Sequence, residues 1–159
     1  MRKYLYLVAF VALLALAILS GCGKRQGQYG NFAKADSVDL VQDAMSALMA
    51  NYPPAKTRLA LVQETEDAFC ASLVETMRAN GYAVAEYVGP ARSDKYQPAV
   101  QKPNGLPFAY LLDGKSDELR MSLHVRADTL SRLYRVQRSG DVLHYIPRGF
   151  WTRKQQEKP

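Results

Sequence analysis

The 159-residue sequence has few of the residue types from which catalytic and metal sites are usually built. It contains two histidines and two cysteines, and neither His124 nor His144 has a partner at the spacing of a zinc motif. A glycine-rich phosphate loop and a Gly-x-Ser-x-Gly nucleophile elbow are both absent from the sequence. We therefore expect no catalytic residues, no bound metal and no cofactor. The alternatives are a metal site that uses the two histidines and a catalytic triad assembled from distant residues.

Long apolar runs are also scarce, and the one present lies at the N-terminus. It covers residues 4–19, behind two basic residues, and is shorter than the about 20 residues that cross a bilayer as a helix. A basic start, an apolar centre and small residues before a cleavage site are typical of a bacterial export signal. The run ends in Leu19-Ser20-Gly21-Cys22, which has the form of a lipobox, the site at which bacterial lipoproteins are cleaved and acylated. We predict a signal peptide over residues 1–21 and lipidation of Cys22, palmitate included. An uncleaved membrane anchor is the alternative.

The residue after the acylated cysteine influences which membrane receives a lipoprotein in bacteria that have two membranes. An aspartate there is the usual signal for retention in the inner membrane, and here the residue is Gly23. The sequence therefore favours the outer membrane, with the chain facing the periplasm, over the inner membrane. Several acyl chains on one cysteine anchor a protein stably, whereas a single chain binds only reversibly.

Lipidation of Cys22 would leave Cys70 as the only other cysteine, so an internal disulfide is excluded. Cys70 lies in a predicted helix among apolar residues, which favours burial as a small hydrophobic side chain. Pairing with another chain and chemical reactivity are the alternatives.

Composition divides the rest of the sequence into a tether, one domain and a short tail. Residues 22–35 contain three glycines and no apolar periodicity, which predicts a flexible tether. Residues 36–154 have the size of one domain, and residues 155–159 are expected to be a disordered tail. Within the domain, residues 88–105 hold three prolines and two glycines, which predicts a long surface loop.

Apolar residues recur at spacings of three and four in two stretches, which predicts two helices. The first has Asp36 or Ser37 as its N-cap and ends near Asn51, before two prolines. The second covers residues 66–80, with Thr65 as its N-cap. Short strands are expected on either side of the second helix, at residues 57–63 and 82–87.

From residue 106 the apolar period changes to two, which predicts an antiparallel meander with one buried side and one solvent-facing side. Its strands are expected at residues 106–112, 119–126, 129–138 and 141–146. Pro147 and Gly149 are expected to end the last of them. The predicted fold class is α+β: a small two-layer domain in which two helices pack on a mainly antiparallel sheet.

Charge is distributed unevenly along the domain. Residues 36–88 carry eight acids and three bases, and residues 119–159 carry nine bases and three acids. A bipolar molecule of this kind suits docking between partners of opposite sign, or head-to-tail packing of copies of itself into a homo-oligomer. The alternative is that the two parts face each other in the fold and neutralise each other.

Basic residues at even spacing in the meander could form one positive sheet face. They are Arg120, Arg126, Arg132 and Arg138. Such a face beside tyrosines could bind single-stranded nucleic acid, lipid phosphates or an acidic protein. An exported lipoprotein rarely meets nucleic acid, so we expect no direct nucleic-acid partner.

The C-terminal part contains an aromatic pair followed by bases. The segment is Phe150-Trp151-Thr152-Arg153-Lys154. A tryptophan beside an arginine is a typical anchor of protein interfaces, so we predict that Phe150, Trp151 and Arg153 bind a partner. The alternative for Trp151 is that it closes the hydrophobic core.

Several segments, taken in order, resemble the TrbH family of conjugal-transfer lipoproteins. Besides the lipobox they are Tyr29-Gly30-Asn31-Phe32, Tyr52-Pro53-Pro54-Ala55-Lys56-Thr57-Arg58-Leu59, the stretch from Asp67-Ala68-Phe69 to Gly81-Tyr82, and Gly149-Phe150-Trp151-Thr152-Arg153-Lys154. The resemblance covers most of the chain after Cys22. It implies a component of the mating-pair-formation apparatus of self-transmissible plasmids, a type IV secretion system, with a structural or assembly role in the cell envelope.

The resemblance also implies that the chain is not an enzyme, holds no cofactor and has other conjugative transfer proteins as partners. The only functional residue that it carries over is the lipidated cysteine, here Cys22. The alternative function is that of a periplasm-facing lipoprotein that binds a cell-wall or small-molecule ligand.

Overall fold

The computed structural model describes residues 27–28, 38–64, 67–87, 104–115 and 117–155. The predicted signal peptide, the lipidation site Cys22 and residues 88–103 of the predicted loop lie outside the described residues.

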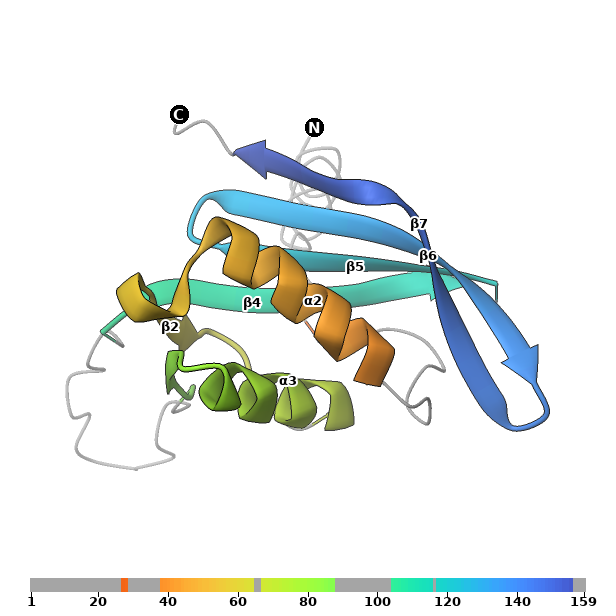
Figure 1. The fold of residues 1–159 in the computed structure, drawn as a ribbon, viewed down its shortest axis with the longest axis horizontal. Helices are drawn as coiled ribbons and strands as arrows, with labels where there is room; N and C mark the ends of the chain where they lie inside the picture. The colour runs from red at the N-terminus through yellow and green to blue at the C-terminus, as the bar shows by residue number, and fades with distance from the viewer. Residues whose placement is uncertain (1–26, 29–37, 65–66, 88–103, 116, 156–159) are drawn as a thin grey trace, which may run out of the picture.

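Two helices cover one face of a single sheet, and this two-layer arrangement confirms the predicted α+β fold class (Figure 1). The helices are α2 (Val38–Asn51) and α3 (Ala68–Ala79), with a short 3-10 turn, η1 (Pro54–Lys56), after α2. The strands are β1 (Gly27–Gln28), β2 (Arg58–Leu61), β3 (Ala83–Ala85), β4 (Leu106–Lys115), β5 (Glu118–Val125), β6 (Asp128–Ser139) and β7 (Val142–Gln155).

The sheet has the order β3-β2-β4-β5-β6-β7, so β7 lies at one end of it. The strands β2 and β3 are parallel and are joined through α3, and β2 is also parallel to β4. From β4 to β7 each strand is antiparallel to its predecessor, as the change of period predicts. The core lies between the sheet and the helices, and its largest fully buried side chains include Tyr110, Tyr134 and Phe108.

The two helices form close to where the apolar spacing predicts them. The buried face of α2 includes Leu40, Met45 and Leu48. The N-cap of α3 is Asp67 and not Thr65, because an Asp67 carboxylate oxygen accepts a hydrogen bond of 2.8 Å from the backbone N–H of Cys70. The helix therefore begins two residues later than predicted.

The last strand does not end where the sequence predicts. β7 continues through Pro147 and Gly149 to Gln155, one residue beyond the expected end of the domain. Proline lacks a backbone N–H and is tolerated in a sheet mainly on edge strands, where one side of the strand needs no ladder partner. Because β7 lies at the end of the sheet, Pro147 does not interrupt it.

Part of the predicted tether is a strand. In β1, Gly27 and Gln28 pair in parallel with Leu111 and Leu112 of β4. The strand β2 pairs with β4 only as far as Phe108, so β1 adds to the part of the β4 edge that β2 leaves open.

Cys70 is fully buried and unpaired, which agrees with the expected structural role. Burial, followed by the nearby Asp67 carboxylate, raises the pKa of the Cys70 thiol to about 11. The hydroxyl of Tyr110 donates a hydrogen bond to the same carboxylate. At neutral pH this thiol is protonated and inaccessible.

Within the described part of the chain, no helix has the length and hydrophobicity needed to span a membrane.

Candidate partner-binding site

Two of the three predicted partner-binding residues, Phe150 and Trp151, lie in a bulge of the edge strand β7, whereas Arg153 lies beyond it and pairs with Leu130 of β6. Ser131 of β6 pairs with Thr152, and Leu133 pairs with Arg148. Only Arg132 lies between the two β6 residues, whereas Gly149, Phe150 and Trp151 lie between the two β7 residues. The three β7 residues therefore oppose a single β6 residue, and such bulges bend a strand and redirect its side chains.

Gly149 allows the chain to enter this bulge. Its φ of +68° lies in the left-handed region, which glycine adopts without the steric cost of a Cβ atom. No atom would lie within 4 Å of a Cβ added there, so the backbone conformation, and not crowding, accounts for glycine at this position.

Arg132 fixes the bulge to the rest of the domain. Its guanidinium donates a hydrogen bond of 2.8 Å to the carbonyl oxygen of Gly149 and two more, of 2.8 and 3.0 Å, to the carboxylate of Asp43 on α2. The hydroxyl of Tyr134 donates to the same carboxylate. Burial, followed by this hydrogen bond, raises the pKa of Tyr134 above its ordinary value. One arginine thus ties β6, the bulge and α2 together.

Phe150 points into solvent at the bulge. Its side chain is 93% exposed, the highest value of any large hydrophobic residue in the described ranges, where the next is Val38 at 60%. Exposing a phenylalanine forgoes about 1.5–3 kcal/mol of hydrophobic stabilisation. Aromatic residues, phenylalanine included, are enriched at protein interfaces relative to the rest of the surface.

Trp151 lies on the other side of the strand from Phe150. Its ring is partly buried and packs against the hydrophobic core, which corresponds to the alternative considered for it. Its indole N–H is buried without a hydrogen-bond partner among the described residues. Trp151 therefore stabilises the fold, whereas the adjacent Phe150 is exposed to solvent.

Arg153 is held by contacts within the domain. Its guanidinium donates a hydrogen bond of 2.6 Å to Asp128 at the start of β6 and lies 6.0 Å from the centre of the Tyr52 ring. The Tyr52 hydroxyl donates to the same carboxylate oxygen. The pKa of Asp128 is lowered, first by the hydrogen bond from Tyr52 and then by Arg153. The pKa of Tyr52 is raised to about 12, first by burial and then by the Asp128 carboxylate.

The structure thus separates the three residues that the sequence predicts as one site. Phe150 is available to a partner, Trp151 packs on the core, and Arg153 is half exposed while it bonds Asp128. The clamp by Arg132 and Asp43 has no signal in the sequence, because the two residues are 89 positions apart.

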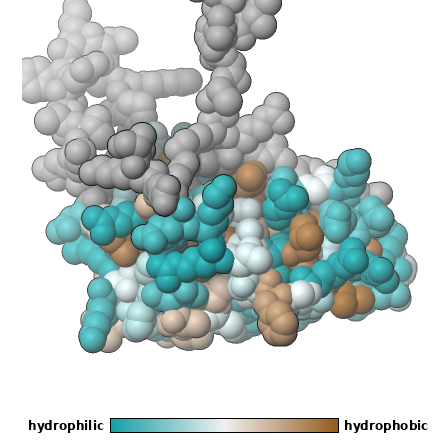
Figure 2. All heavy atoms as spheres, turned by 90° about the horizontal axis from the view of Figure 1, so that it is seen from above, coloured by the Kyte–Doolittle hydropathy of each residue, from teal (hydrophilic) through white to brown (hydrophobic). Residues whose placement is uncertain are grey.

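The surface seen from above, over the β7 side of the domain, is mostly hydrophilic, with small and separate hydrophobic spots (Figure 2). Apolar residues scattered singly over a polar surface are normal for a folded domain, so this view by itself does not mark an interface.

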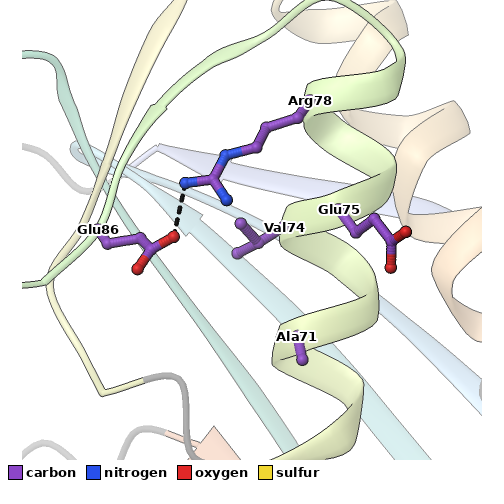
Figure 3. A pocket seen from close by; sticks show the side chains of 5 residues that line it. All are labelled: Ala71, Val74, Glu75, Arg78 and Glu86. Atoms are coloured by element: carbon purple, nitrogen blue, oxygen red, sulfur yellow. Dashed lines mark hydrogen bonds and ion pairs between the residues drawn. The ribbon is translucent and has the colours of Figure 1, made fainter.

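A hollow of about 280 Å³ lies between α3 and Glu86, which follows β3 (Figure 3). Its lining includes Val74, Glu75 and the ion pair between Arg78 and Glu86, whose atoms are 2.6 Å apart. The hollow is open, it falls below the ~300–1,000 Å³ of typical ligand pockets, and half of each charged side chain of the pair is exposed. It therefore offers little shelter to a small-molecule ligand.

Among the described residues, no cluster of three or more histidine, cysteine or acidic side chains could hold a metal ion. The two histidines lie apart in the sheet, His124 on β5 and His144 on β7.

A family model described as conjugal transfer protein TrbH matches residues 24–155 of the chain. No curated protein and no solved structure matches the chain.

Proposed function

We propose that this chain, which belongs to the TrbH family of conjugal transfer proteins, is a lipoprotein that docks and assembles parts of the conjugative apparatus in the cell envelope. In this proposal Cys22 is acylated, the domain faces the periplasm from the outer membrane, and the chain acts without catalysis or cofactor. Its partners are other proteins of the mating-pair-formation, type IV secretion system.

The single observation that carries the docking role is the exposed Phe150 on a clamped bulge. A side chain that is 93% exposed gains nothing from the fold, while Arg132 holds its backbone through Gly149 and Asp43. A preorganised anchor loses little conformational entropy when it binds. The geometry therefore suits a protein that binds a neighbouring subunit through the β7 edge of its sheet.

The lipid anchor rests on the lipobox at residues 19–22. Acylation of Cys22 would keep the domain on its membrane, where its partners assemble. A docking protein of this kind needs a stable fold and a fixed contact surface, but no cavity. This matches a described domain whose hollow beside α3 is small and open.

Site-specific photocrosslinking in cells that carry the complete transfer system tests the docking role. A photoreactive phenylalanine analogue at position 150 is expected to give a covalent adduct with another transfer protein. The same analogue at Val142, which is 43% exposed at the far end of β7, is the matched control. The docking role is wrong if position 150 gives no adduct, or only the adducts that position 142 gives.

A further inference from the structure

We propose that the face of the sheet opposite α2 and α3, called here the helix-free face because no helix of the described residues covers it, lies against the membrane and binds anionic phospholipid headgroups. This inference rests on the lipid anchor of the proposed function and adds the orientation of the domain. It uses the register of the sheet, the charges of its two faces and the position of β1.

The strand register determines which side chains share the helix-free face. Residues directly opposite each other on neighbouring strands point to the same side of a sheet. One row across the sheet runs from Asp113 through Arg120 and Leu133 to Arg148, and the next contains Glu118 and Arg135. Leu119 and Tyr134, which alternate with these residues along β5 and β6, face the helices and are buried.

Bases dominate this face, which we call the basic face. Its basic residues, all exposed, are Arg58, Lys115, Arg120, Arg135, Arg148 and Lys154. Its acids are Asp113 and Glu118, so six bases against two acids leave a net charge of +4. Within the described residues only Arg148 among the six bases has an ion pair, a contact of 3.4 Å to Glu118. The other five charges are uncompensated by ion pairs there.

The helical layer has the opposite sign. Helices α2 and α3 together carry Asp39, Asp43 and Glu75 against Arg78, a net charge of −2. Anionic lipid attracts clusters of lysine and arginine close to its surface and repels acids. Of the two faces of the domain, the basic face is therefore the one that an anionic bilayer would attract.

The position of β1 keeps the domain close to the proposed anchor. Gly27 is paired with Leu111 on β4, and a chain from residue 22 to residue 27 spans at most about 18 Å even when fully extended. A tether that was free as far as Val38 would span up to about 58 Å. Pairing of β1 therefore keeps the charges of the sheet near the bilayer. This matters because salt screens electrostatic attraction beyond a Debye length of about 10 Å.

With the basic face on the bilayer, helices α2 and α3 point away from the membrane, because they cover the opposite face of the sheet.

Lipid-borne quenchers test the orientation. The full-length lipidated chain is reconstituted in vesicles of phosphatidylethanolamine and phosphatidylglycerol that contain a headgroup-quencher lipid. A fluorophore is attached in separate variants through Thr152→Cys on the basic face and through Glu75→Cys on α3. The unsubstituted chain is the labelling control, because Cys70 is buried. We expect the label at position 152 to be quenched more strongly, by about a factor of two or more.

Charge reversal provides the matched comparison. The double substitution Arg120→Glu and Arg135→Glu is expected to remove the difference between the two labels, as are vesicles in which phosphatidylcholine replaces phosphatidylglycerol. Lys56→Glu with Arg138→Glu changes the net charge equally, at exposed positions outside the basic face, and is expected to preserve the difference.

The possible failures are distinguishable. The first failure concerns a chain that mass spectrometry shows to be acylated and flotation shows to be membrane-bound. If its two labels are quenched equally, or position 75 is quenched more strongly, the proposed orientation is wrong and the lipid anchor stands. A chain that is neither acylated nor bound contradicts the anchor and overturns the orientation with it. If charge reversal leaves the quenching unchanged but abolishes plasmid transfer, the basic face serves a protein partner and the inference is wrong.

Discussion

Arg132 on β6 donates hydrogen bonds to both carboxylate oxygens of Asp43 on α2, at 2.8 and 3.0 Å. This contact joins the acidic and the basic parts of the chain, and its two side chains are only 18% and 20% exposed. It neutralises one base of the meander, whereas Arg120, Arg135 and Lys154 have no ion pair within the described residues. Mutual neutralisation of the two charged segments is therefore local, and the basic face keeps most of its charge.

The clamp is expected to contribute to stability. Arg132→Ala removes the bonds to Asp43 and Gly149 and leaves the carboxylate largely buried. We expect the free energy of unfolding to fall by about 2 kcal/mol, between the values typical of exposed and of fully buried ion pairs. Urea unfolding followed by circular dichroism measures this. Arg148→Ala, which removes an exposed pair of 3.4 Å, is the control and should change stability by less than about 0.5 kcal/mol. Equal losses for both variants would contradict the clamp.

Phe150 and Trp151 are expected to give opposite phenotypes although they are adjacent. Phe150→Ala should leave the free energy of unfolding within about 0.5 kcal/mol of the wild type, because the side chain is exposed, and should reduce plasmid transfer. Trp151→Ala should lower the free energy of unfolding by about 2 kcal/mol, because the ring packs on the core. Thermal or urea unfolding of both variants checks this. A destabilised Phe150→Ala protein would show that the residue serves the fold.

Asp128 gives the stability of the domain a dependence on acid pH. Its folded-state pKa is lowered from 3.8, first by the hydrogen bond from Tyr52 and then by Arg153. The carboxylate therefore stabilises the fold fully above its unfolded-state pKa, and this contribution is lost as the pH falls through the lower folded-state pKa. We expect the stability difference between wild type and Asp128→Asn to be larger at pH 7 than at about pH 2. Urea unfolding at both pH values measures it, and a difference independent of pH would contradict the assignment.

The Cys70 thiol is expected to be unreactive in the folded chain. It is fully buried, and its pKa is raised to about 11, so at pH 8 fewer than about one thiol in a hundred is ionised. Ellman's reagent should therefore react only after the protein is unfolded in urea. Rapid reaction of the native protein would show that the helix opens, or that the thiol is accessible.

The sequence predicts the parts of the fold that follow from regular spacing. Apolar side chains three and four apart locate α2 and α3, and alternation locates β4, β5 and β6, because these patterns reflect which face is buried. The sequence misplaces the end of β7, since Pro147 and Gly149 usually terminate strands but are tolerated on an edge and in a bulge. The bulge depends on pairing with β6, which local sequence does not specify.

The candidate site was predictable only in part. The aromatic pair at positions 150 and 151 is visible in the sequence, but their separation onto two sides of the strand follows from the register with β6. The interactions of Arg132 and of Arg153 join segments far apart in the chain, so no local pattern reveals them. Cys22 lies outside the described residues, and its lipidation stays a prediction from the lipobox.

The central claim is that the chain is a membrane-tethered docking component of conjugal transfer, and a plasmid mating assay tests it most directly. The gene is deleted and complemented with wild type, Cys22→Ala, Phe150→Ala or the control Val142→Ala, with export and abundance checked for each protein. We predict that deletion abolishes transfer, that wild type and Val142→Ala restore it, and that Cys22→Ala and Phe150→Ala do not. Full transfer with both the Cys22 and Phe150 variants, or with the deletion itself, would contradict the account.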